Sequence, residues 1–174
     1  MPKLLQNKYL QLFLLSLVVR LMYLILIKGI DSPPQGDEGG YLKLGDYLLG
    51  QAPESFFIFR APLAGFIFTP FFLIFGSSSQ IARIVNVLIS SVFAPLIFSI
   101  LKIKFDKEKP SFYLSLFWVF CPPSIFYSSM ITSETLAGLL VLIFVFVFQK
   151  NEMKIKINHA NNEENKQIHL VRKS

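Results

Sequence analysis

The stretch Ile81–Leu101, IARIVNVLISSVFAPLIFSIL, decides the fold class of this chain. It carries one charge, Arg83, and is about as long as the roughly 20 apolar residues with which a helix crosses a bilayer. Further apolar blocks occupy residues 9–28, 111–128 and 132–149. The 174 residues are 53% hydrophobic and only 16% charged, whereas a soluble domain is about 25% charged. The sequence therefore predicts an all-α, multi-pass transmembrane helical bundle with about four spans.

The distribution of basic residues predicts the orientation of these spans. Lys and Arg number 17 against 11 Asp and Glu, and the excess lies in the loop Lys102–Lys109 and in residues 150–174. Lys and Arg are retained on the cytoplasmic side of membranes. We therefore expect cytoplasmic N- and C-termini, no nucleic-acid partner, and a polar, basic, poorly ordered cytoplasmic tail at 150–174. The short basic leader favours the plasma membrane, of the bacterial inner-membrane kind.

Residues 29–80 then form an external loop, in which we expect two juxtamembrane helices. Glu38–Leu49 is amphipathic and too short to span, which suits a helix on the membrane surface. Ala61–Phe75 is apolar throughout but would rise only about 22 Å, against a hydrocarbon core of about 30 Å. If it crossed the membrane, both basic segments would lie outside. Charge parity therefore places it in the interface as a surface or half-inserted helix.

The adjacent carboxylates Asp37 and Glu38 are the most suggestive polar residues at membrane level. An ionised carboxylate beside an apolar phase is costly and is usually kept for a partner or a task. At the start of a helix the backbone dipole would favour and orient both groups, as suits a general base or a metal ligand. From spacing alone, the favoured alternative is that Asp37 caps the helix. A metal could bind such a pair, but no further external cluster favours one, so we predict no metal and no cofactor.

Several short patterns in a fixed order give the chain a family resemblance. They follow the first apolar block and comprise Gly36-Asp37-Glu38 with Tyr41, Leu48-Leu49-Gly50, Arg60-Ala61-Pro62-Leu63, Phe75-Gly76, Arg83 with Asn86, Pro122-Pro123, and Ser133-Glu134. In this order they resemble the N-terminal part of polyprenyl-phosphate-dependent glycosyltransferases of the GT-C fold. That group includes the protein O-mannosyltransferases and the lipid A aminoarabinose transferases. The resemblance covers about Leu10–Phe148, so we treat residues 1–149 as a GT-C-like transmembrane module.

The resemblance implies a role for each matching residue. Asp37 would be the catalytic carboxylate that takes a proton from the acceptor hydroxyl, and Glu38 would orient the acceptor or assist. Arg60 and Arg83, with Lys43 as a weaker candidate, would bind the donor phosphate. Supporting roles would fall to Glu134 and Tyr41. The alternatives left open are that Arg60 and Arg83 are interfacial anchors, and that Glu134 assists an N-cap at Ser133.

The resemblance also implies partners: the lipid bilayer and a polyprenyl-phosphate sugar donor. Full-length members of the group have more transmembrane helices, so we expect a truncated or split copy, with a second polypeptide as a candidate to complete the fold. The alternative hypothesis is a non-catalytic membrane subunit derived from such an enzyme. A small transporter component is the third and weakest hypothesis. Arg20, inside the first span, should face other helices and find an ion pair or a carbonyl there.

Overall fold

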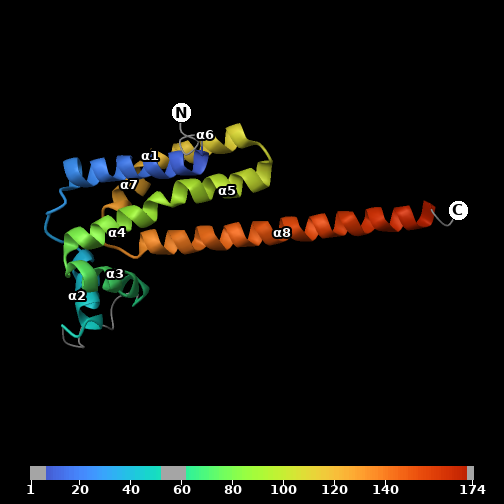
Figure 1. Cartoon of the computed structure of the whole chain (residues 1–174). Coiled ribbons are helices and arrows are strands. Elements are labelled where there is room, and N and C mark those ends of the chain that lie inside the picture. The colour runs from blue at the N-terminus through green and yellow to red at the C-terminus, as the bar shows by residue number, and fades with distance from the viewer. Residues whose placement is uncertain (1–6, 52–61, 172–174) are drawn as a thin grey trace.

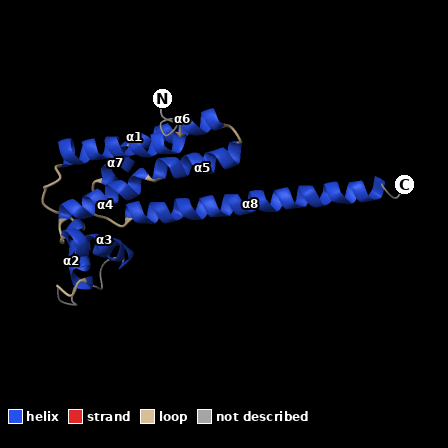
Figure 2. Cartoon of the chain, viewed as in Figure 1, coloured by secondary structure: helices blue, strands red, loops and turns tan. Residues whose placement is uncertain are grey.

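The computed structural model describes residues 7–51 and 62–171, and every element in these ranges is a helix, with no strand among them (Figure 2). This confirms the predicted all-α class for the described part of the chain. In chain order the elements are α1 (Lys8–Tyr23), the π-helical turn η2 (Leu24–Lys28), α2 (Glu38–Leu48), α3 (Pro62–Phe75), α4 (Ser79–Ser91), α5 (Phe93–Phe105), α6 (Glu108–Val119), α7 (Pro122–Ser128) and α8 (Glu134–Val171).

Among the described residues, three helical stretches are long and apolar enough to cross a membrane: Lys8–Lys28, Ser79–Phe105 and Glu134–His159. They correspond to α1 with η2, to α4 with α5, and to the first part of α8, and they run side by side in Figure 1. The second stretch changes helix at Val92. Pro95 lies just beyond that point and has no N–H to donate to the carbonyl of Ser91. By length and composition, these helices are consistent with a membrane protein.

The predicted span at 111–128 is not a continuous helix. Helix α6 ends at Val119 and α7 begins at Pro122, with Pro122 and Pro123 in its first turn. A residue before proline is pushed out of the helical conformation, and Cys121 is indeed extended (φ −66°, ψ 114°). Helix α6 packs on α1 and α5, and α7 packs on α1 and α4, so the two short helices bring the chain back along the bundle.

Residues 150–171 differ from the expected poorly ordered tail, because α8 continues as one helix of 38 residues to Val171. No Gly or Pro follows Gly138 in this helix, and Lys, Glu, Gln and Met favour the helical conformation. At 1.5 Å per residue the helix is about 57 Å long, well beyond a hydrocarbon core of about 30 Å. Its C-terminal part accordingly projects from the bundle (Figure 1).

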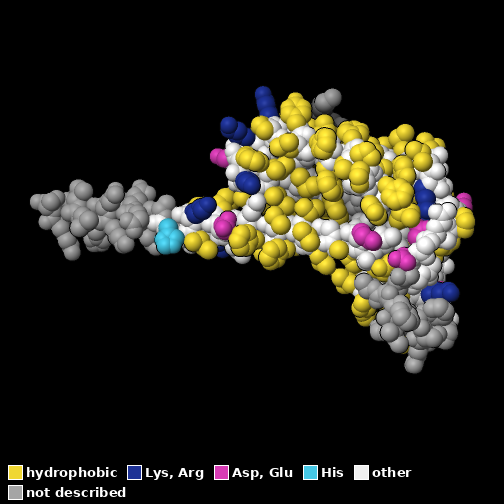
Figure 3. Space-filling model, turned by 180° about the vertical axis from the view of Figure 1, so that it is seen from behind, with side chains coloured by type: hydrophobic (Ala, Val, Ile, Leu, Met, Phe, Trp, Pro, Cys, Tyr) yellow, Lys and Arg dark blue, Asp and Glu magenta, His cyan; other side chains and the backbone are white. Residues whose placement is uncertain are grey.

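The basic segments share one end of the bundle. The start of α1, the α5–α6 connection and the projecting part of α8 all lie toward this end, which we call the basic end (Figure 1). Figure 3 shows its lysine side chains in dark blue, beyond a flank covered by hydrophobic side chains. The start of α2, the start of α4 and the α7–α8 connection lie at the opposite end, which we call the α2 end. This arrangement agrees with the prediction that the N-terminus and both basic segments lie on the same side of the bundle.

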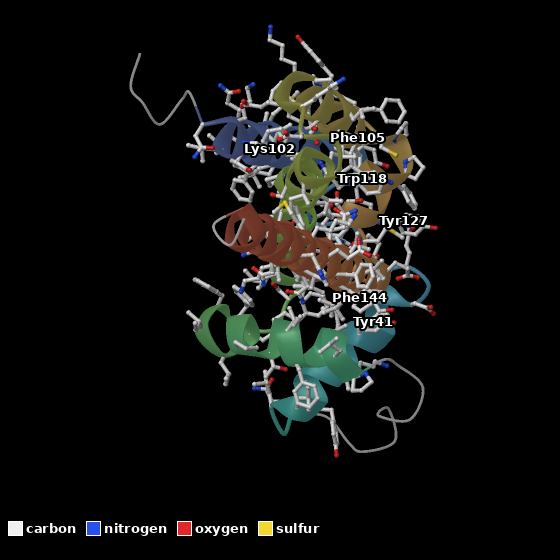
Figure 4. All side chains as sticks on the ribbon, turned by 90° about the vertical axis from the view of Figure 1, so that its right-hand side faces the viewer. Tyr41, Lys102, Phe105, Trp118, Tyr127 and Phe144 are labelled. Atoms are coloured by element: carbon white, nitrogen blue, oxygen red, sulfur yellow. The ribbon has the colours of Figure 1, made fainter. Side chains whose placement is uncertain are left out.

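Helices α2 and α3 pack against each other at the α2 end and run across the direction of the bundle (Figures 1 and 4). Two glycines allow the close approach. A Cβ atom on Gly45 would lie 2.5 Å from the Phe72 ring, and one on Gly65 would lie 2.6 Å from Leu44 Cγ. The pair shares a buried cluster with α4 and the α7–α8 connection: Tyr41, Ala64, Phe68, Phe72, Ala82, Val85 and Ile131. The two helices expected within residues 29–80 are therefore present, and the second is too short to span a membrane.

Arg20 faces other helices, as predicted, and is fully buried. Its Nε donates to Ser90 Oγ of α4 at 2.7 Å, and its Nη2 donates to Ser124 Oγ of α7 at 2.7 Å. Its Nη1 donates to the hydroxyl and the carbonyl of Ser16, one turn earlier in α1. The predicted carbonyl partner is confirmed. The predicted alternative, an ion pair, is replaced by hydrogen bonds to serine hydroxyls. One guanidinium thus joins α1, α4 and α7.

Candidate functional site

The two carboxylates are positioned by the connection that follows η2. Gly29 (φ 80°) and Gly36 (φ 55°) adopt the left-handed region that favours glycine, so the chain turns sharply before α2. The backbone N–H of Glu38 donates to the carbonyl of Gln35 at 3.1 Å and closes the second turn. Asp37 therefore stands at the N-cap position, and Glu38 is the first residue of α2.

Glu38 is fully buried and joins segments that are far apart in the sequence. Its Oε2 accepts hydrogen bonds from the backbone N–H of Gln35 at 2.8 Å and from Arg83 Nη2 at 3.1 Å. The ammonium of Lys28 lies 3.6 Å from the same oxygen. Its Oε1 accepts from the backbone N–H of Ile131 at 3.0 Å. We call Lys28, Glu38 and Arg83 the Glu38 cluster.

These contacts keep Glu38 ionised. Burial alone would raise the pKa of the carboxyl group, but the hydrogen bonds from Gln35, Ile131 and Arg83, with the charge of Arg83, outweigh it and lower the pKa. A carboxylate with both oxygens occupied and a lowered pKa is poorly suited to take a proton from an acceptor. Glu38 therefore has the geometry of a positioning residue.

Arg83, a predicted phosphate-binding residue, is also fully buried. Its Nη1 donates to the carbonyls of Ile30 at 2.9 Å and Ser32 at 2.7 Å, and its Nη2 donates to Glu38. Its Nε has no hydrogen-bond partner within the described residues. The guanidinium thus holds the 29–36 connection against α4. An interfacial anchor would reach water, so full burial argues against that alternative for Arg83.

Asp37 contrasts with its neighbour because it is exposed. Its backbone carbonyl accepts from the N–H groups of Gly40 at 3.0 Å and Tyr41 at 3.3 Å, which starts the helix. Its side chain makes no capping hydrogen bond, so the capping alternative holds for the position but not for the carboxylate. Lys43 is exposed on the same helix. Arg60 lies outside the described residues.

Tyr41 and Glu134 lie at the same end. The Tyr41 hydroxyl donates to Ser133 Oγ at 2.8 Å, which joins α2 to the residue before α8. Glu134 begins α8, is exposed, and lines a cavity of about 220 Å³ to which α4, α5, α6, α7 and α8 all contribute. Aromatic side chains form much of the cavity wall, and Figure 4 places two of them on one flank of the bundle: Trp118 and Tyr127.

The structure therefore brings Glu38, Arg83 and Tyr41 together at the α2 end, and Asp37 is exposed beside them. Sequence reasoning missed Lys28 and the backbone N–H of Ile131 as partners of Glu38. The position of Lys28 at the end of the first apolar block was the available signal, since a buried acid needs a nearby cation. Within the described residues, no three His, Cys, Asp or Glu side chains are grouped closely enough to hold a metal ion.

Comparison with models of protein families, with curated proteins and with solved structures finds no match to this chain.

Proposed function

We propose that this chain is a glycosyltransferase of the GT-C kind, or the N-terminal portion of one, acting at the membrane face where α2 lies. It would transfer a sugar from a polyprenyl-phosphate donor to an acceptor hydroxyl. The observation that carries the proposal is the exposed carboxylate of Asp37, fixed at the start of α2 by the buried Glu38 next to it. In this proposal α6 and α7 together form a broken fourth span.

The reaction assigns separate tasks to the two carboxylates. Asp37 takes the proton of the acceptor hydroxyl as that oxygen forms a bond to the anomeric carbon of the sugar. The bond from that carbon to the phosphate oxygen breaks, and its electron pair leaves with the phosphate, so the configuration inverts. Glu38 does not touch substrate but positions the helix start.

The leaving phosphate needs a fixed cation nearby. Lys43 is exposed on the helix that carries Asp37, and Arg60 precedes α3 in sequence, so these two residues are the direct candidates. Arg83 acts indirectly, because it holds the carbonyls of Ile30 and Ser32 on the path into α2. Tyr41 and Glu134 support the face through the contact between α2 and the start of α8.

The test is donor turnover by the purified chain in proteoliposomes. Polyprenyl-phosphate sugars of several kinds are supplied with a soluble hydroxyl acceptor, and release of polyprenyl phosphate is measured. Asp37→Asn should lower turnover by about 100-fold or more, since a positioned general base contributes about that much. Asp106→Asn, an exposed carboxylate at the basic end, is the matched control and should keep full turnover. Full turnover by Asp37→Asn would overturn the proposal.

A specific observation favours a second candidate, a non-catalytic membrane subunit. Only 6% of the membrane-length window in Glu134–His159 is buried by the rest of the described chain. Such a helix has room for a partner polypeptide in the membrane. In this case Glu38 and Arg83 only stabilise the fold, and Asp37→Asn changes no transfer activity. Sugar transfer by the purified chain alone would exclude this candidate.

A further inference from the structure

A groove lies at the basic end, where α8 leaves the bundle beside the last turn of α5. It encloses about 460 Å³, within the range of ordinary small-molecule sites. Its lining is divided by chemistry. Ile103, Phe144 and Phe148 supply apolar surface, and Lys104, Gln149 and Lys156 supply polar groups.

The groove lies at the level where both helices change from apolar to polar. On α8 the change falls between Phe148 and Gln149, and on α5 it falls between Leu101 and Lys102. The cavity is lined by residues on both sides of the α8 transition and by Ile103 and Lys104, just after the α5 transition, so the groove straddles the boundary between hydrocarbon and headgroups. Phe144 and Phe148 stack at 6.3 Å between ring centroids and stay 69% and 54% exposed, which gives a flat apolar surface on the hydrocarbon side.

The charge of the groove favours an anion. Lys104 and Lys156 face a single acidic lining residue, Glu152, and neither lysine forms an ion pair within the part of the chain that the structure describes. Lys104 Nζ lies 5.8 Å from the centre of the Phe105 ring, a contact that leaves it able to bind an anion. Further lysines belong to the basic end but do not line the groove: Lys102, Lys107, Lys109, Lys150 and Lys154.

We infer that this groove binds one anionic phospholipid, with its phosphate at Lys104 and Lys156 and an acyl chain along Phe144 and Phe148. Basic pockets between membrane helices are typical sites for anionic headgroups. The oxygen Oε1 of Gln149 is buried and accepts no hydrogen bond within the described residues, so it can accept one from a headgroup hydroxyl. The lipid then joins α5 to α8 at the last point where the two helices lie together. This site is independent of the proposed transfer reaction.

The test is native mass spectrometry of the purified full chain with phosphatidylglycerol or phosphatidylcholine of identical acyl chains. Wild type should retain one phosphatidylglycerol in preference to phosphatidylcholine. The variant Lys104→Gln/Lys156→Gln should bind phosphatidylglycerol about tenfold or more weakly. Glu152→Gln, which removes the one acidic group of the lining, should bind it more tightly. Unchanged circular dichroism of each variant establishes that the fold is intact.

The matched control is Lys102→Gln/Lys154→Gln. It removes one charge from each of the same two helices, at residues that do not line the groove. Its affinity should stay within about threefold of wild type, because screened charges outside a site contribute little. Equal weakening of both double variants would overturn the site in favour of a general basic surface. Equal retention of phosphatidylcholine, or displacement of the lipid by millimolar inorganic phosphate alone, would also overturn it.

Discussion

Replacement of Glu38 by glutamine removes one charge from the most buried ionic group at the α2 end while keeping the size of the side chain. The amide has one acceptor oxygen where the carboxylate has two, so either Gln35 N–H or Ile131 N–H loses its partner. Arg83, fully buried, loses its counter-charge. Removal of one member of a buried pair costs about 3–5 kcal/mol, because the other charge stays desolvated. We expect a loss of that size in the free energy of unfolding.

Thermal unfolding of the purified chain in detergent, followed by circular dichroism, measures this loss. For a protein of this length each kcal/mol lowers Tm by about 2–4 °C, so Glu38→Gln should unfold about 6–20 °C below wild type. Asp37→Asn is the matched control, since it removes the adjacent and exposed charge, and it should cost less than about 1 kcal/mol. The double variant Glu38→Gln/Arg83→Met should be more stable than the sum of its single variants predicts, because the two side chains are in contact.

The dependence on pH gives a second readout of the same interaction. The pKa of Glu38 in the folded protein lies below its usual 4.5, so its contribution to stability is fully present above that pH. The contribution is lost as the pH falls through the lowered folded pKa. The Tm difference between wild type and Glu38→Gln should therefore narrow below pH 4.5. If Glu38→Gln lowers the free energy of unfolding by less than about 1 kcal/mol, or if its effect is strictly additive with that of Arg83→Met, the Glu38 cluster does not stabilise the α2 end as a buried ion pair.

Three further changes test other parts of the structure. Arg20→Lys should lower the free energy of unfolding by about 1–3 kcal/mol, because an ammonium cannot reach the hydroxyls of three helices. An unchanged Tm would contradict this prediction. Gly45→Val should lower the free energy of unfolding by about 1–3 kcal/mol, because the added side chain overpacks against α3. Gly39→Val on the same helix is the control, since its side chain would face open space. Equal losses for the two variants would show that the α2–α3 contact is not tight. Single cysteines at Gly36 and Lys107, in a background without the native cysteine, should react with impermeant reagents from opposite sides of the membrane. Labelling of both from one side would contradict the placement of the α2 end and the basic end on opposite faces of the membrane.

Local pattern was sufficient to predict the elements of the external loop. The expected helices Glu38–Leu49 and Ala61–Phe75 are α2 (Glu38–Leu48) and α3 (Pro62–Phe75), because amphipathic spacing and bounding glycines are properties of neighbouring residues. The parity of the basic segments could also be predicted, since it depends only on where lysines fall between apolar blocks. The break at Pro122-Pro123 was visible in the sequence but was outweighed by the apolar composition around it.

Tertiary pairing could not be predicted in the same way. Arg83 and Glu38 are separated by two helices in sequence, and nothing in their immediate neighbours indicates that they meet. The sequence indicated both as candidates for chemistry at membrane level, whereas the structure buries both of them. Asp37, next to Glu38, stays exposed because the first turn of α2 points adjacent side chains in different directions. A difference of one position in helical phase thus separates a carboxylate that is buried and holds the fold from one that is exposed.

The dispersed origin of the Glu38 cluster also imposes an order on biogenesis. The ribosome delivers Lys28 and Glu38 long before Arg83, and Ile131 arrives last. Until Arg83 is made, the new carboxylate has only the nearby ammonium of Lys28 as a counter-charge. The start of α2, which is made early, is thus held by the backbone N–H of Ile131, which is made late. Premature termination or stalling before Ile131 would leave Oε1 of Glu38 without the hydrogen bond that it accepts from the Ile131 N–H.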